Sequence, residues 1–149
     1  MNVEQQPILL VEDDPNDVLL LQRAFQRSGI VNPLQVARHG DEAVDYLSGS
    51  ASYGDRQQYP VPVFMLLDLK LPRRSGLEVL QWVKERPGLK RIPIVVLTSS
   101  KNDADINRAY ELGANSYLVK PVSFEDLLNL VKSLQLYWLM LNESPALEP

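Results

Sequence analysis

The sequence contains no cysteine, so disulfide bonds, thiolate nucleophiles and cysteine-ligated zinc sites are all excluded. Proteins stapled by disulfides are typical of oxidising compartments, and a chain without them is typical of the cytosol. We therefore expect a cytoplasmic location. Histidine is nearly absent too: His39 is the single example, and we assign it no functional role.

Long apolar runs and clusters of basic residues are also missing. Residues 1–6 carry no positive charge and no long apolar stretch, and no later apolar run approaches membrane-spanning length. The net charge is -4 and the lysines and arginines are dispersed, so the electrostatic footprint of a nucleic-acid-binding protein is lacking. We expect neither a membrane nor a nucleic acid as partner.

The composition that remains is that of one globular domain. The chain has 149 residues, of which 45% are hydrophobic and 23% are charged. We expect a single domain over residues 1–149, with its core at about 7–136 and a C-terminal helical extension and tail at about 137–149. Residues 48–62, rich in Gly, Ser, Gln and Pro, are predicted to be a long surface connection and not a domain boundary.

Short β-rich apolar runs alternate with longer segments of helical period. The runs predict strands at 8–11, around Val36, at 63–67, 94–97 and 117–119. The helical segments follow at 15–28, 41–47, 77–85, 103–112 and from 124 to about 142. Five strand–helix pairs with largely apolar strands indicate an α/β fold, a doubly wound five-stranded parallel sheet with helices on both faces.

Polar side chains gather where the predicted strands end. In an open parallel sheet, ligands bind beyond the carboxyl ends of the strands, which we call the carboxyl edge. The residues that follow the strands there are Glu12, Asp13, Asp14, Asp68, Thr98, Ser99 and Lys120. Clustered carboxylates repel one another and usually hold a cation, and an all-oxygen set suits Mg²⁺.

A lysine and a threonine at the same edge complete a set of groups suited to phosphoryl transfer. The oxygens of a transferred phosphoryl group need metal, cation and hydroxyl donors at once, and a carboxylate would then be the nucleophile. Asp14 precedes Pro15, the favoured first residue of a helix, so we interpret Asp14 as a helix cap and exclude it from the metal ligands.

Four segments resemble the signature motifs of the response regulator receiver domains of two-component systems. They are residues 8–14 (ILLVEDD), 66–72 (LLDLKLP), 95–99 (VVLTS) and 117–121 (YLVKP). The resemblance covers about residues 7–136 and implies a flavodoxin-like strand order of 2-1-3-4-5. It also implies a protein that accepts a phosphoryl group from a sensor histidine kinase or phosphotransfer protein and switches protein contacts. The residues after Leu136, about a dozen, are too few for an output domain, so we expect none. We also expect no enzyme activity beyond the protein's own phosphotransfer and dephosphorylation.

The resemblance implies a role for each matching residue. Asp68 would be the phosphoacceptor. Mg²⁺ or another divalent cation would be held by Asp13, Asp68 and the backbone carbonyl of Lys70, and by Glu12 largely through water. Thr98 and Lys120 would bind the phosphoryl oxygens, Tyr117 would change rotamer in the switch, and Pro121 would follow a cis peptide. Lys70 and Ser100 occupy variable positions that tune the lifetime of the phosphoryl group, which the sequence leaves open.

A narrower resemblance is to stand-alone receivers associated with phytochrome-type sensor kinases. It rests on the apolar residues 136–139, the 48–62 connection and residues 90–93. One apolar stripe of the last helix, which includes Trp138 and Leu141, is expected to cover the sheet. The residues off that stripe predict a homodimer built on the C-terminal helix region: Leu130, Leu136, Tyr137, Leu139 and Met140. The alternative is a tail that folds back on its own domain.

Other readings of the same residues stay open to different degrees. A phosphatase of the haloacid-dehalogenase type needs a second acid two residues after the nucleophile, where Lys70 stands. Residues 49–54 have the glycine spacing of a phosphate-binding loop, but Asp55 replaces the required lysine. A receiver that works without phosphorylation would have lost Asp13, Asp68 or Lys120. Tyr117 fits a core aromatic as well as a switch residue.

Overall fold

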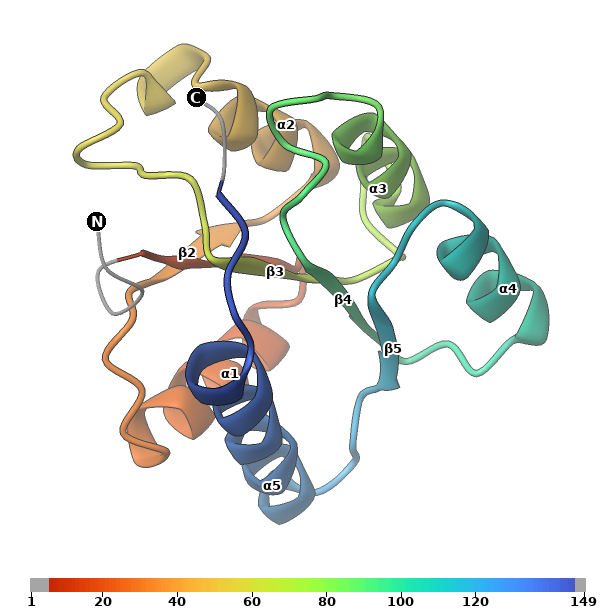
Figure 1. Ribbon diagram of the computed structural model, residues 1–149. Coiled ribbons are helices and arrows are strands. Elements are labelled where there is room, and N and C mark those ends of the chain that lie inside the picture. Colours follow the sequence, from red (N-terminus) through yellow and green to blue (C-terminus); the bar gives the residue numbers. More distant parts are fainter. Residues whose placement is uncertain (1–5, 147–149) are drawn as a thin grey trace.

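The computed structural model describes residues 6–146, and its centre is a five-stranded parallel sheet of order β2-β1-β3-β4-β5 (Figure 1). The predicted strand order is therefore confirmed. All four strand pairs are parallel and in continuous register, with Ile8 opposite both Leu34 and Phe64. The strands are β1 (Ile8–Val11), β2 (Leu34–Ala37), β3 (Phe64–Leu67), β4 (Ile94–Thr98) and β5 (Ser116–Val119).

Helices cover both faces of the sheet, as predicted. Figure 1 shows α1 and α5 side by side on one face, while α2 and α3 lie on the other and α4 flanks β5. The helices are α1 (Pro15–Arg27), α2 (Gly40–Ser48), α3 (Gly76–Lys84), α4 (Asp103–Glu111) and α5 (Phe124–Leu134). No helix in residues 6–146 is both long enough and apolar enough to cross a membrane.

The alternation of strand side chains divides the core into two layers. Ile8 and Leu10 pack among the residues of α1 and α5, whereas Leu9 and Val11 pack among those of α2 and α3. All four side chains are at most 1% exposed. Burial on both sides explains why β1 is an unbroken apolar run and shows no polar alternation.

Polar caps fix where the helices begin. The Asp14 carboxylate accepts a hydrogen bond from the Asn16 N–H at 2.8 Å, which confirms Asp14 as the cap of α1. Ser75 and Glu78 form a reciprocal capping box at the start of α3. His39, which the sequence left without a role, caps α2 by accepting from the Glu42 N–H through Nδ1 at 3.1 Å.

The connection between α2 and β3 contains the short 3-10 helix η2 (Ala51–Tyr53) and is anchored to the domain. The Arg56 guanidinium donates to the backbone carbonyls of Tyr46, Leu47 and Tyr59 at 2.7–3.0 Å. The rings of Tyr46, Tyr53 and Tyr59 pack together with centroids 4.9–6.0 Å apart. The connection between α2 and β3, although rich in polar residues, therefore has a defined structure, which the sequence did not predict.

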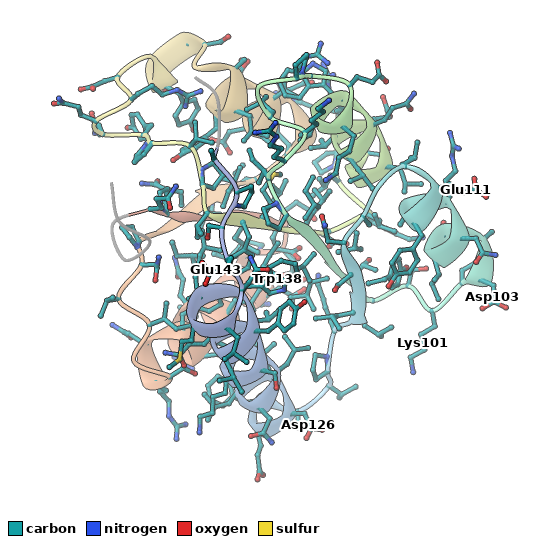
Figure 2. All side chains as sticks on the ribbon, in the orientation of Figure 1. Lys101, Asp103, Glu111, Asp126, Trp138 and Glu143 are labelled. Atoms are coloured by element: carbon teal, nitrogen blue, oxygen red, sulfur yellow. The ribbon has the colours of Figure 1, made fainter. Side chains whose placement is uncertain are left out.

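After α5 the chain continues into the wider π-helical segment η3 (Gln135–Leu141). Trp138 lies between this segment and the sheet (Figure 2), with its ring centroid 6.3 Å from that of Phe64. The predicted stripe is wrong at its end, since Leu139 packs against the core and Leu141 is 65% exposed. The cause is the wider turn, in which the Asn142 N–H reaches the Tyr137 carbonyl five residues back. Leu130 also packs against the core, contrary to the prediction.

Candidate functional site

Backbone hydrogen bonds extend the sheet by one residue and so set the site residues side by side. The Asp68 N–H donates to the Val11 carbonyl at 3.0 Å, and the Lys120 N–H donates to the Thr98 carbonyl at 2.8 Å. These bonds align the end of β1 with the end of β3, and the end of β4 with the end of β5, along the carboxyl edge. The structure thus brings the predicted residues together at the carboxyl edge.

Three carboxylates converge at this edge. One oxygen from each of Glu12, Asp13 and Asp68 lies within 4.8 Å of the others. Glu12 is 1% and Asp68 is 6% exposed, whereas Asp13 faces solvent. An all-oxygen donor set with one open side fits Mg²⁺, which keeps several water ligands and binds through few carboxylates. The observed donors therefore fit the predicted divalent cation.

Lys120 is the cation shared by two of these carboxylates, Glu12 and Asp68, and by the nearby Asp17. Its Nζ lies 2.5 Å from Glu12 Oε2, 2.9 Å from Asp17 Oδ2 and 3.0 Å from Asp68 Oδ2. Asp17 was missed in the sequence. The available signal was its position three residues after the cap Asp14, in the first turn of the helix that leaves the carboxyl edge.

The protein environment keeps Asp68 ionised. Burial alone would raise the pKa of Asp68, but interactions with the Thr98 hydroxyl, the Lys120 ammonium and the Lys70 N–H lower it below its ordinary value. Burial likewise works against the charged form of Lys120, yet its bonds to Glu12, Asp17 and Asp68 raise its pKa. An ionised carboxylate beside a charged lysine is a suitable nucleophile.

Glu12 is the carboxylate that takes up a proton most readily. Burial, aided by the charge of Asp68, raises the pKa of Glu12 to about 7, against the opposing hydrogen bond from Lys120. Two buried carboxylates competing for one ammonium cannot both be fully stabilised as anions. Near neutral pH, Glu12 therefore changes charge while Asp68 does not.

Thr98 presents a buried hydroxyl to the site. The residue is 1% exposed, and its Oγ1 makes no hydrogen bond of normal distance and angle within residues 6–146. Its interaction with Asp68 is nevertheless sufficient to lower the pKa of that carboxylate. Buried hydroxyls without a good partner are rare, and one at an anion-accepting site fits a role toward a phosphoryl oxygen.

Tyr117 and Ser100 organise the segment that follows β4. The Tyr117 hydroxyl donates to the Ser100 carbonyl at 2.9 Å, and the Ser100 hydroxyl bonds Asp105 Oδ2 at 2.6 Å. The Tyr117 ring also packs against the core, so the switch role of Tyr117 stays a prediction. The peptide before Pro121 is trans, since residues 6–146 contain no cis bond, and the expected cis geometry is wrong. Trans is the intrinsically favoured form even before proline.

Lys70 lies at the opening of the site with its side chain exposed. Its N–H donates to Asp68 Oδ1 at 3.3 Å, and the role of its carbonyl as a metal ligand stays a prediction. Behind it, Gly76 closes the turn against the acceptor's own backbone. A Cβ at Gly76 would lie 2.1 Å from the Asp68 carbonyl oxygen, so only glycine fits there. Gly76 was not predicted from the sequence.

Comparison with known proteins decides the family. Residues 8–132 match the model of the response regulator receiver domain. The chain belongs to the response regulator receiver family. The probable methanogenesis regulatory protein FilR2 of Methanothrix harundinacea is 45% identical over 93% of this chain and 87% of its own length. Response regulator Rcp1 of Synechocystis is 41% identical over 93% of this chain and 92% of its own length.

Solved receiver structures agree with the fold described here. The phosphorylated cyanobacterial phytochrome response regulator RcpA superimposes with a TM-score of 0.89 at 37% identity, over 95% of this chain and 99% of its own. The Mn²⁺-bound form of Rcp1 gives a TM-score of 0.85 at 40% identity, with the same coverage. The predicted receiver family, and its stand-alone relatives that include a phytochrome response regulator, are confirmed.

The pKa of Glu12 predicts that Mg²⁺ binding depends on pH. The predicted role of Glu12 as a metal ligand requires its charged carboxylate. Because the pKa of Glu12 is raised to about 7, this carboxyl is protonated below that pH and ionised above it. We expect the Mg²⁺ affinity measured by calorimetry to rise about tenfold from about pH 6 to pH 8, with release of a proton. Glu12→Gln should bind more weakly with a flat pH profile. A flat profile for the unaltered chain would contradict this.

Proposed function

We propose that the protein is a phosphoacceptor switch in which Asp68 receives a phosphoryl group from a sensor histidine kinase or a phosphotransfer protein. The observation that carries this is the position of Asp68. Its carboxylate is ionised, buried, within 4.8 Å of two other carboxylates and 3.0 Å from the Lys120 ammonium. The domain is proposed to comprise residues 1–149, with a core at about 7–136.

The proposed reaction is a displacement at phosphorus. An Asp68 carboxylate oxygen forms the new P–O bond as the P–N bond to the donor's imidazole breaks, and the imidazole leaves with the bonding electrons. Glu12, Asp13, Asp68 and the Lys70 carbonyl would hold Mg²⁺ or another divalent cation, which neutralises charge on the phosphoryl oxygens. Support for that cation comes from the donor set and from the Mn²⁺ form of Rcp1.

Two side chains of this chain would receive the transferred group. The Lys120 ammonium would pair with one phosphoryl oxygen, since it already lies 3.0 Å from the acceptor carboxylate. The Thr98 hydroxyl, which has no good partner now, would donate to another. A shift of Thr98 toward the phosphoryl group would change the packing near Ser100 and bias Tyr117 between two rotamers. The two states would then differ in which proteins they bind.

The proposed donor is a sensor kinase of the phytochrome type. RcpA is described as a phytochrome response regulator, and this chain covers 99% of it at a TM-score of 0.89. We propose that the protein has no enzyme activity beyond its own phosphotransfer and dephosphorylation. The cytoplasmic location and the absence of a nucleic-acid partner stay predictions.

We also propose a homodimer through the C-terminal helix region. Four side chains there are 51–68% exposed and form an apolar surface, which we call the C-terminal patch: Leu136, Tyr137, Met140 and Leu141. The alternative, a tail that folds back, has some support because Arg91 Nη1 donates to the Ala146 carbonyl at 3.2 Å. The tail nevertheless leaves these four side chains exposed. A twofold partner would bury them.

The phosphoacceptor proposal is tested by Asp68→Asn. The amide has nearly the same volume but is no nucleophile, so incorporation of phosphate from a small phosphodonor or a cognate kinase should vanish while the unfolding midpoint stays near that of the unaltered chain. Phosphate would be followed by intact-protein mass spectrometry. Asp55→Asn, in the exposed connection, is the matched control and should be labelled normally. Acid-labile phosphate on Asp68→Asn would refute the assignment.

The dimer proposal is tested by light scattering at micromolar concentration. We expect a dimeric mass for the unaltered chain and a monomeric mass for the Tyr137→Asp, Met140→Asp double variant, because two charges in the patch oppose burial. The circular dichroism spectrum should not change. Val31→Asp, at an exposed apolar residue far from α5 in the chain, is the control and should remain dimeric. A monomeric mass for the unaltered chain argues against the dimer.

A further inference from the structure

The ammonium of Lys120 has three N–H donors, and the structure directs all of them to carboxylates. Two of the acceptors, Glu12 and Asp68, belong to the proposed metal site. The third, Asp17, lies outside it, on the first turn of α1, and no step of the proposed reaction uses it. Its side chain is 34% exposed, against 1% for Glu12 and 8% for Asp68.

The surroundings strengthen the bond between Asp17 and Lys120. The two residues meet beside a small cavity of about 30 Å³ whose other walls include Leu20, Leu97 and Leu127. These walls and the low exposure of the Lys120 side chain, 13%, shield the pair in part from water, so it is stronger than a charge pair in open solvent. The backbone of Asp17 is fixed as well, because the cap Asp14 and Pro15 set the start of α1.

Phosphorylation would change which groups accept hydrogen bonds from the Lys120 ammonium. Formation of the acyl phosphate removes the negative charge from the Asp68 carboxylate, and a phosphoryl oxygen must accept the N–H bond that this carboxylate accepted before. A divalent cation would at the same time attract the Glu12 carboxylate. Asp17 is then the remaining carboxylate that can hold the ammonium without competing for either the metal or the phosphoryl group.

We propose that Asp17 is a positioning residue that holds the Lys120 ammonium where the phosphoryl oxygen binds. The proposal rests on the phosphoacceptor function of Asp68. Asp17 touches neither the acceptor nor the phosphoryl group and acts through Lys120. It also joins the first turn of α1 to the site, so that a displacement of α1 would move the ammonium.

The test uses beryllofluoride, a phosphoryl mimic that binds noncovalently, with saturating Mg²⁺ and the full chain. We expect Asp17→Ala to weaken beryllofluoride binding about tenfold, the range of one charge-assisted hydrogen bond, and Asp17→Glu to restore part of the loss. Asp126→Ala is the matched control, because Asp126 occupies the same third position of α5 and points away from the sheet (Figure 2). Asp126→Ala removes one negative charge from the first turn of a helix, as Asp17→Ala does, and it should bind beryllofluoride normally.

A double-mutant cycle separates positioning from a general structural effect. In a Lys120→Gln background, Asp17→Ala should have no further effect on beryllofluoride affinity, because the group it positions is gone. An equal loss in both backgrounds, or an equal loss in Asp126→Ala, would overturn the proposal. A second readout is the ¹⁵N NMR signal of the Lys120 ammonium, whose protons should exchange faster with water in Asp17→Ala. Unchanged exchange together with unchanged affinity would also overturn it.

The two proposals fail in distinguishable ways. If the unaltered chain did not bind beryllofluoride at all, the phosphoacceptor function would be at fault. If it bound and Asp17→Ala bound equally well, only the role of Asp17 would be lost.

Discussion

The site depends on one ammonium group that offsets a cluster of carboxylates, two of which, Glu12 and Asp68, are buried. Lys120 lies within 3.0 Å of oxygens from Glu12, Asp17 and Asp68, and a fourth carboxylate, that of Asp13, is close to two of these. Removing carboxylates from water is costly unless each finds a cation or a hydrogen bond. Burial raises the pKa of Glu12 to about 7 although its hydrogen bond from Lys120 opposes this, whereas for Asp68 the effect of burial is outweighed by the Thr98 hydroxyl and the Lys120 ammonium, and the pKa is lowered. This imbalance leaves the site ready for a divalent cation.

The fold supplies this arrangement through backbone geometry. Parallel strands end at one edge, so residues far apart in the chain meet there without any long loop. The β1 and β3 ladder continues through the Asp68 N–H to the Val11 carbonyl, which keeps the acceptor in line with the acidic residues after β1. Gly76 lets the following turn come against the Asp68 carbonyl, where a Cβ would be only 2.1 Å away. Since cores are close-packed, that contact leaves the acceptor little freedom to move.

Much of this could be predicted from the sequence, because the signals are local. The apolar runs gave the strands, the helices and the α/β class, whereas the strand order came from the resemblance to the receiver family. Polar residues at the strand ends gave Glu12, Asp13, Asp68, Thr98 and Lys120. Asp17 was missed because its place in the first turn of α1 shows only that it lies near the carboxyl edge, while its role depends on the direction of the Lys120 side chain. The predicted apolar stripe was wrong at Leu139 and Leu141. The π-helical turns of η3 change which side chains face the core, and the apolar composition gives no sign of such turns. The trans peptide before Pro121 contradicted an expectation taken only from the family.

Urea unfolding of Lys120→Met at about pH 8 shows whether Lys120 offsets the charge of the carboxylates until a metal does. In EDTA, we expect a loss of about 3 kcal/mol in the free energy of unfolding, as is typical when one partner of a buried ion pair is removed. Saturating Mg²⁺ should recover much of that loss, because the cation supplies the missing positive charge and binds only the folded state. The same loss with and without Mg²⁺, or no loss in EDTA, would contradict the claim.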